Sequence, residues 1–293
     1  MRKRRHLWVL PISVVIAIVS LWLSGYAQSR APDVHYVPTP EDVVDEMLRV
    51  TGVTKDDIVY DLGCGDGRLV ITAAKRFGAR GVGIDIDPQR ISESRENARQ
   101  AGVADRVRFL EQDLFEADIG QATIVTLYLL PKLNVQLRPK LLRDLKPGTR
   151  VVSHDFDMAE WHPDQTIRVP GASRSHTVYY WVVPADVGGV WHVQIPAGRA
   201  KQRYELRLQQ EFQAVHGTIG AEGRETPISN ASLVGDRLRF TARPDAQGQM
   251  SFDGRVDTNL LHGRVEIRGG SLEGQYDWVS QRQAESPASA PPR

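Results

Sequence analysis

The sequence predicts two folded domains of different class: an α/β domain with a doubly wound, Rossmann-like sheet over residues 31–184, and a small all-β barrel or sandwich over residues 187–282. Three observations support this division. A glycine-rich turn joins a β-favouring run to a helical pattern near residue 63. Apolar runs and amphipathic stretches alternate up to about residue 183. Short runs with polar alternation, typical of antiparallel strands, then replace them.

Residues 1–30 are predicted to be directed to a membrane. A basic cluster at residues 2–5 precedes an uncharged apolar run at residues 7–27, and a run of about 20 residues can span a bilayer. Its length favours an uncleaved transmembrane anchor, whereas the small-x-small pattern at residues 25–27 is typical of a cleaved signal segment, and both interpretations stay open. The positive-inside rule would leave the basic end in the cytoplasm and the rest of the chain on the far side.

The glycine-rich turn follows an apolar run at residues 58–62 and holds glycines at alternate positions, Gly63, Gly65 and Gly67. Glycines permit positive φ and close approach of a ligand, and the following helix N-terminus offers unpaired N–H groups. A plain connection is the alternative, but acids further on lie where a nucleotide cofactor needs them. A dinucleotide fingerprint would place its third glycine at Arg68, and a P-loop would need a lysine. The spacing therefore disfavours nicotinamide cofactors and ATP.

Asp61 and these glycines form the pattern D-x-G-x-G-x-G. The pattern resembles the first motif of class I methyltransferases, which use S-adenosylmethionine as the cofactor. The resemblance implies that Asp61, Gly63, Gly65 and Gly67 bind this cofactor, and that the Rossmann-like sheet is a methyltransferase sheet.

Two further acids at predicted strand ends complete the expected cofactor site. Asp85 ends the second strand (residues 81–85), about 20 residues after the first glycine, where a carboxylate can accept hydrogen bonds from both ribose hydroxyls. Asp113 follows the third strand and either caps a helix or accepts a bond from the adenine amino group, of which the second is favoured. The neighbouring Ile86 and Leu114 are included in the predicted cofactor site.

A helix is predicted to begin after YVPTP at residues 36–40. Thr39 is a suitable N-cap, and Asp42 would complete a capping box. The helix either simply packs against the sheet or forms a lid over the cofactor, helped by Tyr36.

The later elements of this domain place two catalytic candidates at strand ends. An apolar run at residues 122–130 is typical of a strand buried on both faces, and Tyr128 lies near its end. The amphipathic helix that follows is expected to kink or split at Pro139. A fifth strand ends at His154, and an antiparallel pair at residues 166–169 and 177–183 closes the domain.

Methyl transfer is an in-line displacement at a sulfonium carbon, so the protein mainly aligns the reactants and excludes water. We expect no metal, because this chemistry requires none and the sequence has no H-x-x-H, C-x-x-C or H-E-x-x-H pattern. A lysine acceptor must lose a proton, because the ammonium has no lone pair. Tyr128 and His154 are the catalytic candidates, and a role at the edge of the core is an equal alternative for each.

The stretches at residues 36–40 and 140–164, together with the glycine motif, resemble a small family of lysine methyltransferases. Its members act on the c protein of the mitochondrial ATP synthase ring and on the adenine nucleotide translocase. The resemblance covers roughly residues 35–183 and implies a protein lysine as the methyl acceptor, including one in a membrane-embedded protein. It identifies no residue that binds the target lysine.

Other functions stay open as alternatives. One is methylation of a small-molecule or lipid-like acceptor, and another is an exported binding module with a relic methyltransferase core. Methylation of nucleobases is disfavoured, since Tyr-Leu-Leu-Pro replaces the Asn/Asp-Pro-Pro-Tyr tetrad of those enzymes, and a net charge of +1 gives no reason to expect nucleic acid as a partner. Because S-adenosylmethionine is made in the cytosol, we favour a membrane-anchored enzyme with a cytosolic catalytic domain over a periplasmic one.

The C-terminal domain is predicted to contain eight short strands, which imply a sandwich or a small closed barrel. Gly189-Val-Trp191 at its start is similar to the G-x-W of lipocalin-like barrels. Such a barrel would hold an apolar ligand, bind a partner or serve as a structural appendage. Residues 283–293, rich in Pro, Ser and Ala, are expected to be a disordered tail.

Overall fold

The structure is a computed structural model that describes residues 35–198, 201–221, 223–244 and 248–283. The predicted membrane-directed segment and residues 284–293 of the predicted tail lie outside these ranges. Within them, no helix has both the length and the apolar character needed to cross a membrane.

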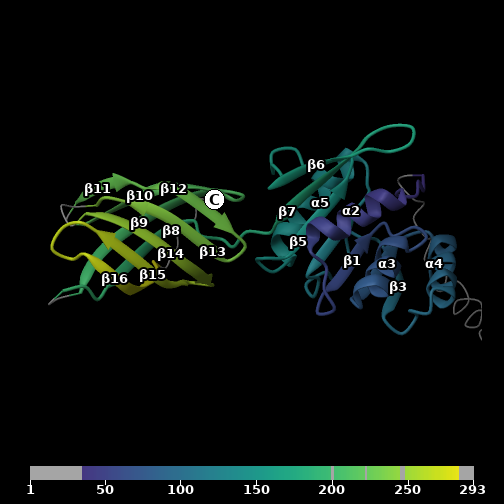
Figure 1. The fold of residues 1–293 in the computed structure, drawn as a ribbon, viewed down its shortest axis with the longest axis horizontal. Helices are drawn as coiled ribbons and strands as arrows, with labels where there is room; N and C mark the ends of the chain where they lie inside the picture. The colour runs from purple at the N-terminus through teal and green to yellow at the C-terminus, as the bar shows by residue number, and fades with distance from the viewer. Residues whose placement is uncertain (1–34, 199–200, 222, 245–247, 284–293) are drawn as a thin grey trace, which may run out of the picture. The chain divides into compact units, whose positions relative to one another are not determined.

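The first domain contains a seven-stranded mixed sheet in the order β3-β2-β1-β4-β5-β7-β6 (Figure 1). Five strands run parallel, and β7 pairs antiparallel with both β5 and β6. The strands are β1 (Ile58–Leu62), β2 (Arg80–Asp85), β3 (Val107–Glu111), β4 (Ile124–Leu127), β5 (Arg150–His154), β6 (Gln165–Val169) and β7 (His176–Val182). This confirms the predicted Rossmann-like sheet with its antiparallel terminal pair.

The strand order reverses next to β1, which lies between β2 and β4. In sheets of this kind, ligands bind outside the carboxyl ends of the strands at such a switch point. The glycine turn follows β1 directly, and Tyr128 follows β4. The topology therefore brings both segments to the same edge of the sheet.

Four helices connect the strands: α2 (Glu41–Thr51), α3 (Arg68–Phe77), α4 (Pro88–Gln100) and α5 (Pro131–Asp144). The apolar stripe of α2, from Val43 to Leu48, is buried, and Gly52 ends this helix in the left-handed conformation, as its pattern predicts. Helix α5 continues through Pro139 to Asp144, so the expected split is wrong.

The predicted capping box of α2 is also wrong. Pro40 occupies the N-cap position, and no side chain caps the helix. Thr39 is buried, and its hydroxyl lies 3.4 Å from Nδ1 of His154 on β5, while the Asp42 carboxylate accepts from the N–H of Val43. A tertiary contact has taken the side chain that the local pattern assigned to the cap.

The C-terminal domain is an antiparallel sheet of nine strands in the order β11-β10-β9-β8-β16-β15-β14-β13-β12. It is nearly closed, since β10 lies against β12 and the N–H of Ile228 donates to the carbonyl of Gly217. The strands are β8 (Gly189–Ile195), β9 (Gln202–Glu211), β10 (Ala214–Ala221), β11 (Arg224–Pro227), β12 (Ser229–Val234), β13 (Arg237–Ala242), β14 (Gln249–Asp257), β15 (Leu260–Arg268) and β16 (Gly274–Arg282).

Large side chains fill the described interior of this second domain. Phe252 stacks on Phe240 with ring centroids 4.5 Å apart and meets Trp278 edge-on at 5.3 Å. Trp191, from the Gly-x-Trp at the start of the domain, is fully buried and donates its indole N–H to the carbonyl of Val187. The barrel prediction is confirmed in outline, and its core is built from packed aromatic and aliphatic residues.

Candidate active site

The glycine turn is held against β2 by its backbone. The N–H groups of Gly63 and Cys64 both donate to the carbonyl of Ile84, at 2.8 and 3.0 Å. Gly63, Gly65 and Gly67 all have positive φ, at 84°, 52° and 79°, a region in which residues with a Cβ are strained. The three alternate glycines of the sequence motif are therefore required by the shape of the turn itself.

Asp85 ties this turn to the end of β2. One oxygen of its carboxylate accepts from the N–H of Gly65 at 2.9 Å, and the other accepts from the N–H of Asp87 at 3.0 Å. Asp87 in turn caps α4 by accepting from the N–H of Gln89. Asp85 thus lies at the carboxyl edge predicted for it, where it orients the glycine turn and faces the expected ribose position.

We predict that Asp85→Ala weakens binding of S-adenosylmethionine by about 1.5–3 kcal/mol, or about 10- to 100-fold, because charge-assisted hydrogen bonds are lost. Titration calorimetry on the full chain measures this. Asp87→Ala is the matched control: it removes a helix cap two residues away and should lower the melting temperature while leaving cofactor affinity nearly unchanged. Equal affinities in the wild type and Asp85→Ala would remove Asp85 from the site.

Asp61 is buried beneath the turn rather than exposed at its surface. Its side chain accepts a 2.7 Å hydrogen bond from the Thr126 hydroxyl on β4. Burial raises the pKa of Asp61 to about 7, and the negative charges of Asp66 and Asp85 raise it further, whereas the Thr126 bond opposes the shift. A carboxyl group that titrates near neutrality at this edge is suited to respond to a positively charged ligand.

The single cysteine lies inside the turn and is buried. Burial raises the pKa of the Cys64 thiol well above its usual value, and the nearby carboxylates of Asp61 and Asp85 act in the same direction. Because the thiolate is the reactive form, Cys64 is a packing residue.

The segment before α2 lies across the glycine turn. A Cβ on Gly65 would meet the ring of Tyr36 at 2.2 Å, so the tyrosine packs directly on this glycine. The Arg90 guanidinium lies over the Tyr36 ring, 4.9 Å from its centroid. Arg68 fastens the segment by donating to the carbonyl of Thr39 at 2.7 Å while it pairs with Asp66. These contacts support the lid interpretation of this segment.

The remaining predicted cofactor residues lie at the same sheet edge. Asp113 comes two residues after β3, and its carboxylate accepts from the N–H of Phe115 at 2.9 Å. Ile86 and Leu114 are half-buried. Their contacts with the cofactor stay predictions, with Asp113 holding its own loop in addition.

Tyr128 and His154, predicted separately from two strand ends, are in direct contact. Their ring centroids are 3.9 Å apart and their planes are tilted by 30°. His154 is fully buried, whereas Tyr128 is only partly buried. Burial lowers the pKa of His154 to about 4, partly opposed by the charge of Asp155, so this imidazole is neutral at physiological pH. Tyr128 is the member of the pair that can touch an acceptor.

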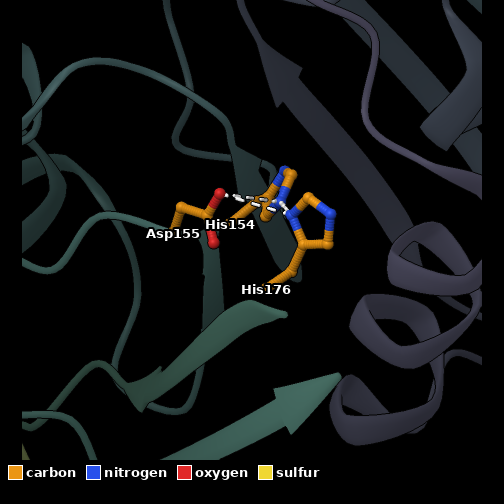
Figure 2. Close-up of side chains that lie close together, drawn as sticks. All are labelled: His154, Asp155 and His176. Carbon is orange, nitrogen blue, oxygen red and sulfur yellow. Dashed lines mark hydrogen bonds and ion pairs between the residues drawn. The ribbon is translucent and has the colours of Figure 1, made fainter. Parts of the chain in front are cut away.

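Sequence reasoning missed two neighbours of His154, which Figure 2 shows beside it. Nε2 of His154 lies 2.8 Å from Nδ1 of His176 and 3.3 Å from the Asp155 carboxylate. Asp155 follows β5 with a φ of 61°, and His176 begins β7. The antiparallel register, which pairs His154 with Val178, explains the contact, because His176 lies two residues from Val178 on the same face.

Comparison with known proteins agrees with this site. A family model for the ANTKMT methyltransferase domain matches residues 61–165. A protein-lysine N-methyltransferase from Saccharolobus islandicus is 50% identical over 156 residues, which make up 53% of this chain and 97% of that protein. The human lysine N-methyltransferase of the ATP synthase c protein is 32% identical over 129 residues. The match covers 44% of this chain and about half (54%) of the human protein.

Among solved structures, a protein from Salinibacter ruber described as an RNA methyltransferase, in complex with S-adenosyl-L-homocysteine, is 57% identical. The similarity covers 52% of this chain and 96% of that one, with a TM-score of 0.50. Its bound product is the demethylated form of the predicted cofactor. The chain therefore belongs to the family of S-adenosylmethionine-dependent methyltransferases that has the ANTKMT methyltransferase domain and includes protein-lysine N-methyltransferases.

Proposed function

We propose that this enzyme transfers a methyl group from S-adenosylmethionine to the side-chain nitrogen of a lysine in a protein, including a protein at a membrane. The observation that carries the proposal is the similarity to the Saccharolobus islandicus enzyme over nearly the whole length of that protein. The matched part of this chain holds the glycine turn and the strand ends described above.

The arrangement of the site fits a lysine acceptor. The amine must approach the methyl carbon in line with the sulfonium, in a site that keeps water out and disfavours the ammonium form. Tyr128 follows β4 beside the glycine turn, where its ring supplies one wall of such a site. His154, stacked behind this ring and out of reach of solvent, acts on the acceptor only by positioning Tyr128.

We predict that Tyr128→Ala lowers kcat by about 10- to 100-fold, because alignment of the acceptor is lost, and leaves the affinity for S-adenosylmethionine unchanged within about twofold. Single-turnover kinetics and calorimetry on the same preparation measure the two effects. Tyr179→Ala, a partly buried tyrosine on β7 that packs on Trp181, is a control for loss of an aromatic ring elsewhere in the domain. A fall in cofactor affinity without a fall in kcat would contradict the assigned role of Tyr128.

The acceptor is tested with radiolabelled S-adenosylmethionine, the full chain, and separate soluble-protein, membrane-protein and RNA fractions from cells that lack the gene. We expect label on lysine residues, located by mass spectrometry, with most of it in the membrane fraction. The Asp85→Ala variant is the control for background transfer. Label confined to RNA or to small molecules would overturn the proposal.

RNA is the second candidate because the similar protein from Salinibacter ruber is described as an RNA methyltransferase. The composition argues against RNA as the acceptor of this chain. Binding to nucleic acid depends on neutralising phosphates with basic side chains, and a net charge of +1 supplies no general excess.

We further propose that the apolar run at residues 7–27 attaches the enzyme to a membrane with the catalytic domain in the cytosol, where the methyl donor is made. The basic cluster at residues 2–5 argues for the opposite orientation, but this charge rule is a bias that other features override. Reporters active only in the cytosol or only in the periplasm, each fused after Arg293, decide the orientation. Activity of the periplasmic reporter alone would overturn this proposal and favour an exported binding module.

A further inference from the structure

Three potential metal-ligand atoms converge beside Tyr128: Nε2 of His154, Nδ1 of His176 and Oδ2 of Asp155 (Figure 2). The distances between them are 2.8, 3.3 and 3.4 Å. Ligand atoms about 2.0–2.1 Å from a tetrahedral Zn²⁺ lie about 3.3 Å from one another, and those on one face of an octahedron lie about 2.9 Å apart. The triangle therefore has the size of one face of a metal's coordination shell.

Hydrogen bonds alone do not satisfy this triangle. If both ring nitrogens carry a proton, two N–H donors face each other across 2.8 Å. If only one carries a proton, the unprotonated nitrogen and the carboxylate oxygen present lone pairs to each other at 3.3 or 3.4 Å. A cation between the three atoms uses all of these lone pairs, since neutral imidazole and carboxylate are the ligating forms of these side chains.

The surroundings keep the three groups in those forms. His154 is fully buried, and only its neutral ring is compatible with its low pKa of about 4. Burial raises the pKa of Asp155, but hydrogen bonds from Arg174 and from the N–H of Thr177 outweigh it, so that the pKa is below its usual value and the carboxylate is ionised.

The backbone and a further side chain fix two of the ligands. Thr177 donates to the other oxygen of Asp155 at 2.9 Å, which leaves Oδ2 turned toward the rings. The Thr39 hydroxyl lies 3.4 Å from Nδ1 of His154, on the side of the ring away from His176. A hydrogen-bond partner at the second ring nitrogen is the usual way in which a metal-binding histidine is oriented.

We propose that His154, Asp155 and His176 form a binding site for a divalent transition-metal ion such as Zn²⁺. Two imidazole nitrogens and one carboxylate oxygen match the donor set of metal sites that keep further coordination positions open. The site joins the ends of β5 and β7 under the ring of Tyr128. A bound ion would fix this end of the sheet and the tyrosine above it.

One neighbouring charge opposes the cation. The Arg174 guanidinium lies 2.5 Å from Oδ2 of Asp155 and is about half exposed. A carboxylate oxygen has two lone pairs and can serve both partners, but the like charge should weaken metal binding. Arg174→Ala should therefore tighten it, in a variant whose change lies at the surface.

The test uses the untagged full chain, treated with a chelator and titrated with Zn²⁺ in the absence of substrate. We expect one ion per chain with a Kd below about 1 µM. His176→Asn should weaken binding at least about 100-fold, and Arg174→Ala should strengthen it about fivefold. His162→Asn, which changes a histidine of the same domain outside the triangle, is the matched control and should bind as the wild type does.

Co²⁺ provides a second measurement that does not depend on the folding of any variant. Bound to the unmutated chain, it should give visible absorption bands of nitrogen ligation, which one equivalent of Zn²⁺ abolishes. Absence of binding by both ions, or equal Zn²⁺ affinities for His176→Asn and His162→Asn, would overturn the proposal. Neither result bears on methyl transfer, because no substrate is present.

Discussion

Gly65→Val is expected to abolish binding of S-adenosylmethionine, with a loss of affinity greater than about 100-fold, or about 3 kcal/mol. Two effects combine at this position. Gly65 has a φ of 52°, which a β-branched residue strongly resists. Its new Cβ would also lie 2.2 Å from the Tyr36 ring, so the tyrosine and the turn must separate. The clash is with a residue of the chain itself, which adds to any clash with the cofactor.

Gly52→Val is the matched control for the backbone effect. Gly52 ends α2 with a φ of 58°, and a Cβ there would meet nothing within 4 Å. This variant should lose a similar amount of stability from strain and keep its affinity for the cofactor. Calorimetry with S-adenosylhomocysteine and thermal melts separate the two quantities. Adding Tyr36→Ala to Gly65→Val should restore part of the lost stability, and wild-type affinity in Gly65→Val would contradict the assigned role of the turn.

Asp61→Asn is expected to change how stability depends on pH. Because the folded-state pKa of Asp61 is raised to about 7, the folded protein binds a proton more tightly than the unfolded chain does. The free energy of unfolding of the wild type should therefore decrease as pH rises from about 4 to about 7, by up to about 4 kcal/mol from this group, and then level off. Asparagine has no such proton and can still accept the bond from Thr126.

Urea unfolding at a series of pH values measures this effect. The variant should be more stable than the wild type above pH 7, with the difference shrinking toward pH 4. Asp56→Asn, an exposed acid at the opposite end of β1, should leave the pH profile unchanged. Identical profiles for Asp61→Asn and the wild type would show that Asp61 is ionised throughout this range.

The same group allows a second readout when the cofactor binds. Its sulfonium carries a positive charge, which favours the ionised form of a nearby carboxyl group. Near pH 6.5 the wild type should release a proton on binding, and Asp61→Asn should not. Calorimetry in buffers with different ionisation enthalpies counts this proton and tests whether Asp61 senses the cofactor from its buried position.

The sheet and the cofactor turn could be predicted from the sequence because both depend on local patterns. Apolar runs of strand length alternate with amphipathic helices, and three glycines at alternate positions specify a backbone that few other residues can adopt. Asp85 could be placed because parallel strands of one sheet end at a common edge. These features need only the order of residues along the chain.

The features that the sequence did not reveal depend on contacts between distant segments. The Thr39 hydroxyl left its helix for His154, and His176 reached His154 through the register of β5 and β7. No local spacing pattern links these residues. Strand β11 (Arg224–Pro227) was missed for a related reason: this four-residue segment of RETP, which lacks an apolar alternation and ends in proline, pairs as an edge strand with β10.

The burial of Cys64 has a practical consequence for labelling. The chain has one cysteine, and its thiol is enclosed and largely protonated at neutral pH. Maleimide reagents, which require an accessible thiolate, should therefore leave the native chain almost unlabelled. A cysteine introduced at exposed Leu130, beside the acceptor side of the sheet, would then be the main point of attachment for a fluorophore. Its emission would report the arrival of a substrate protein without prior removal of the natural cysteine.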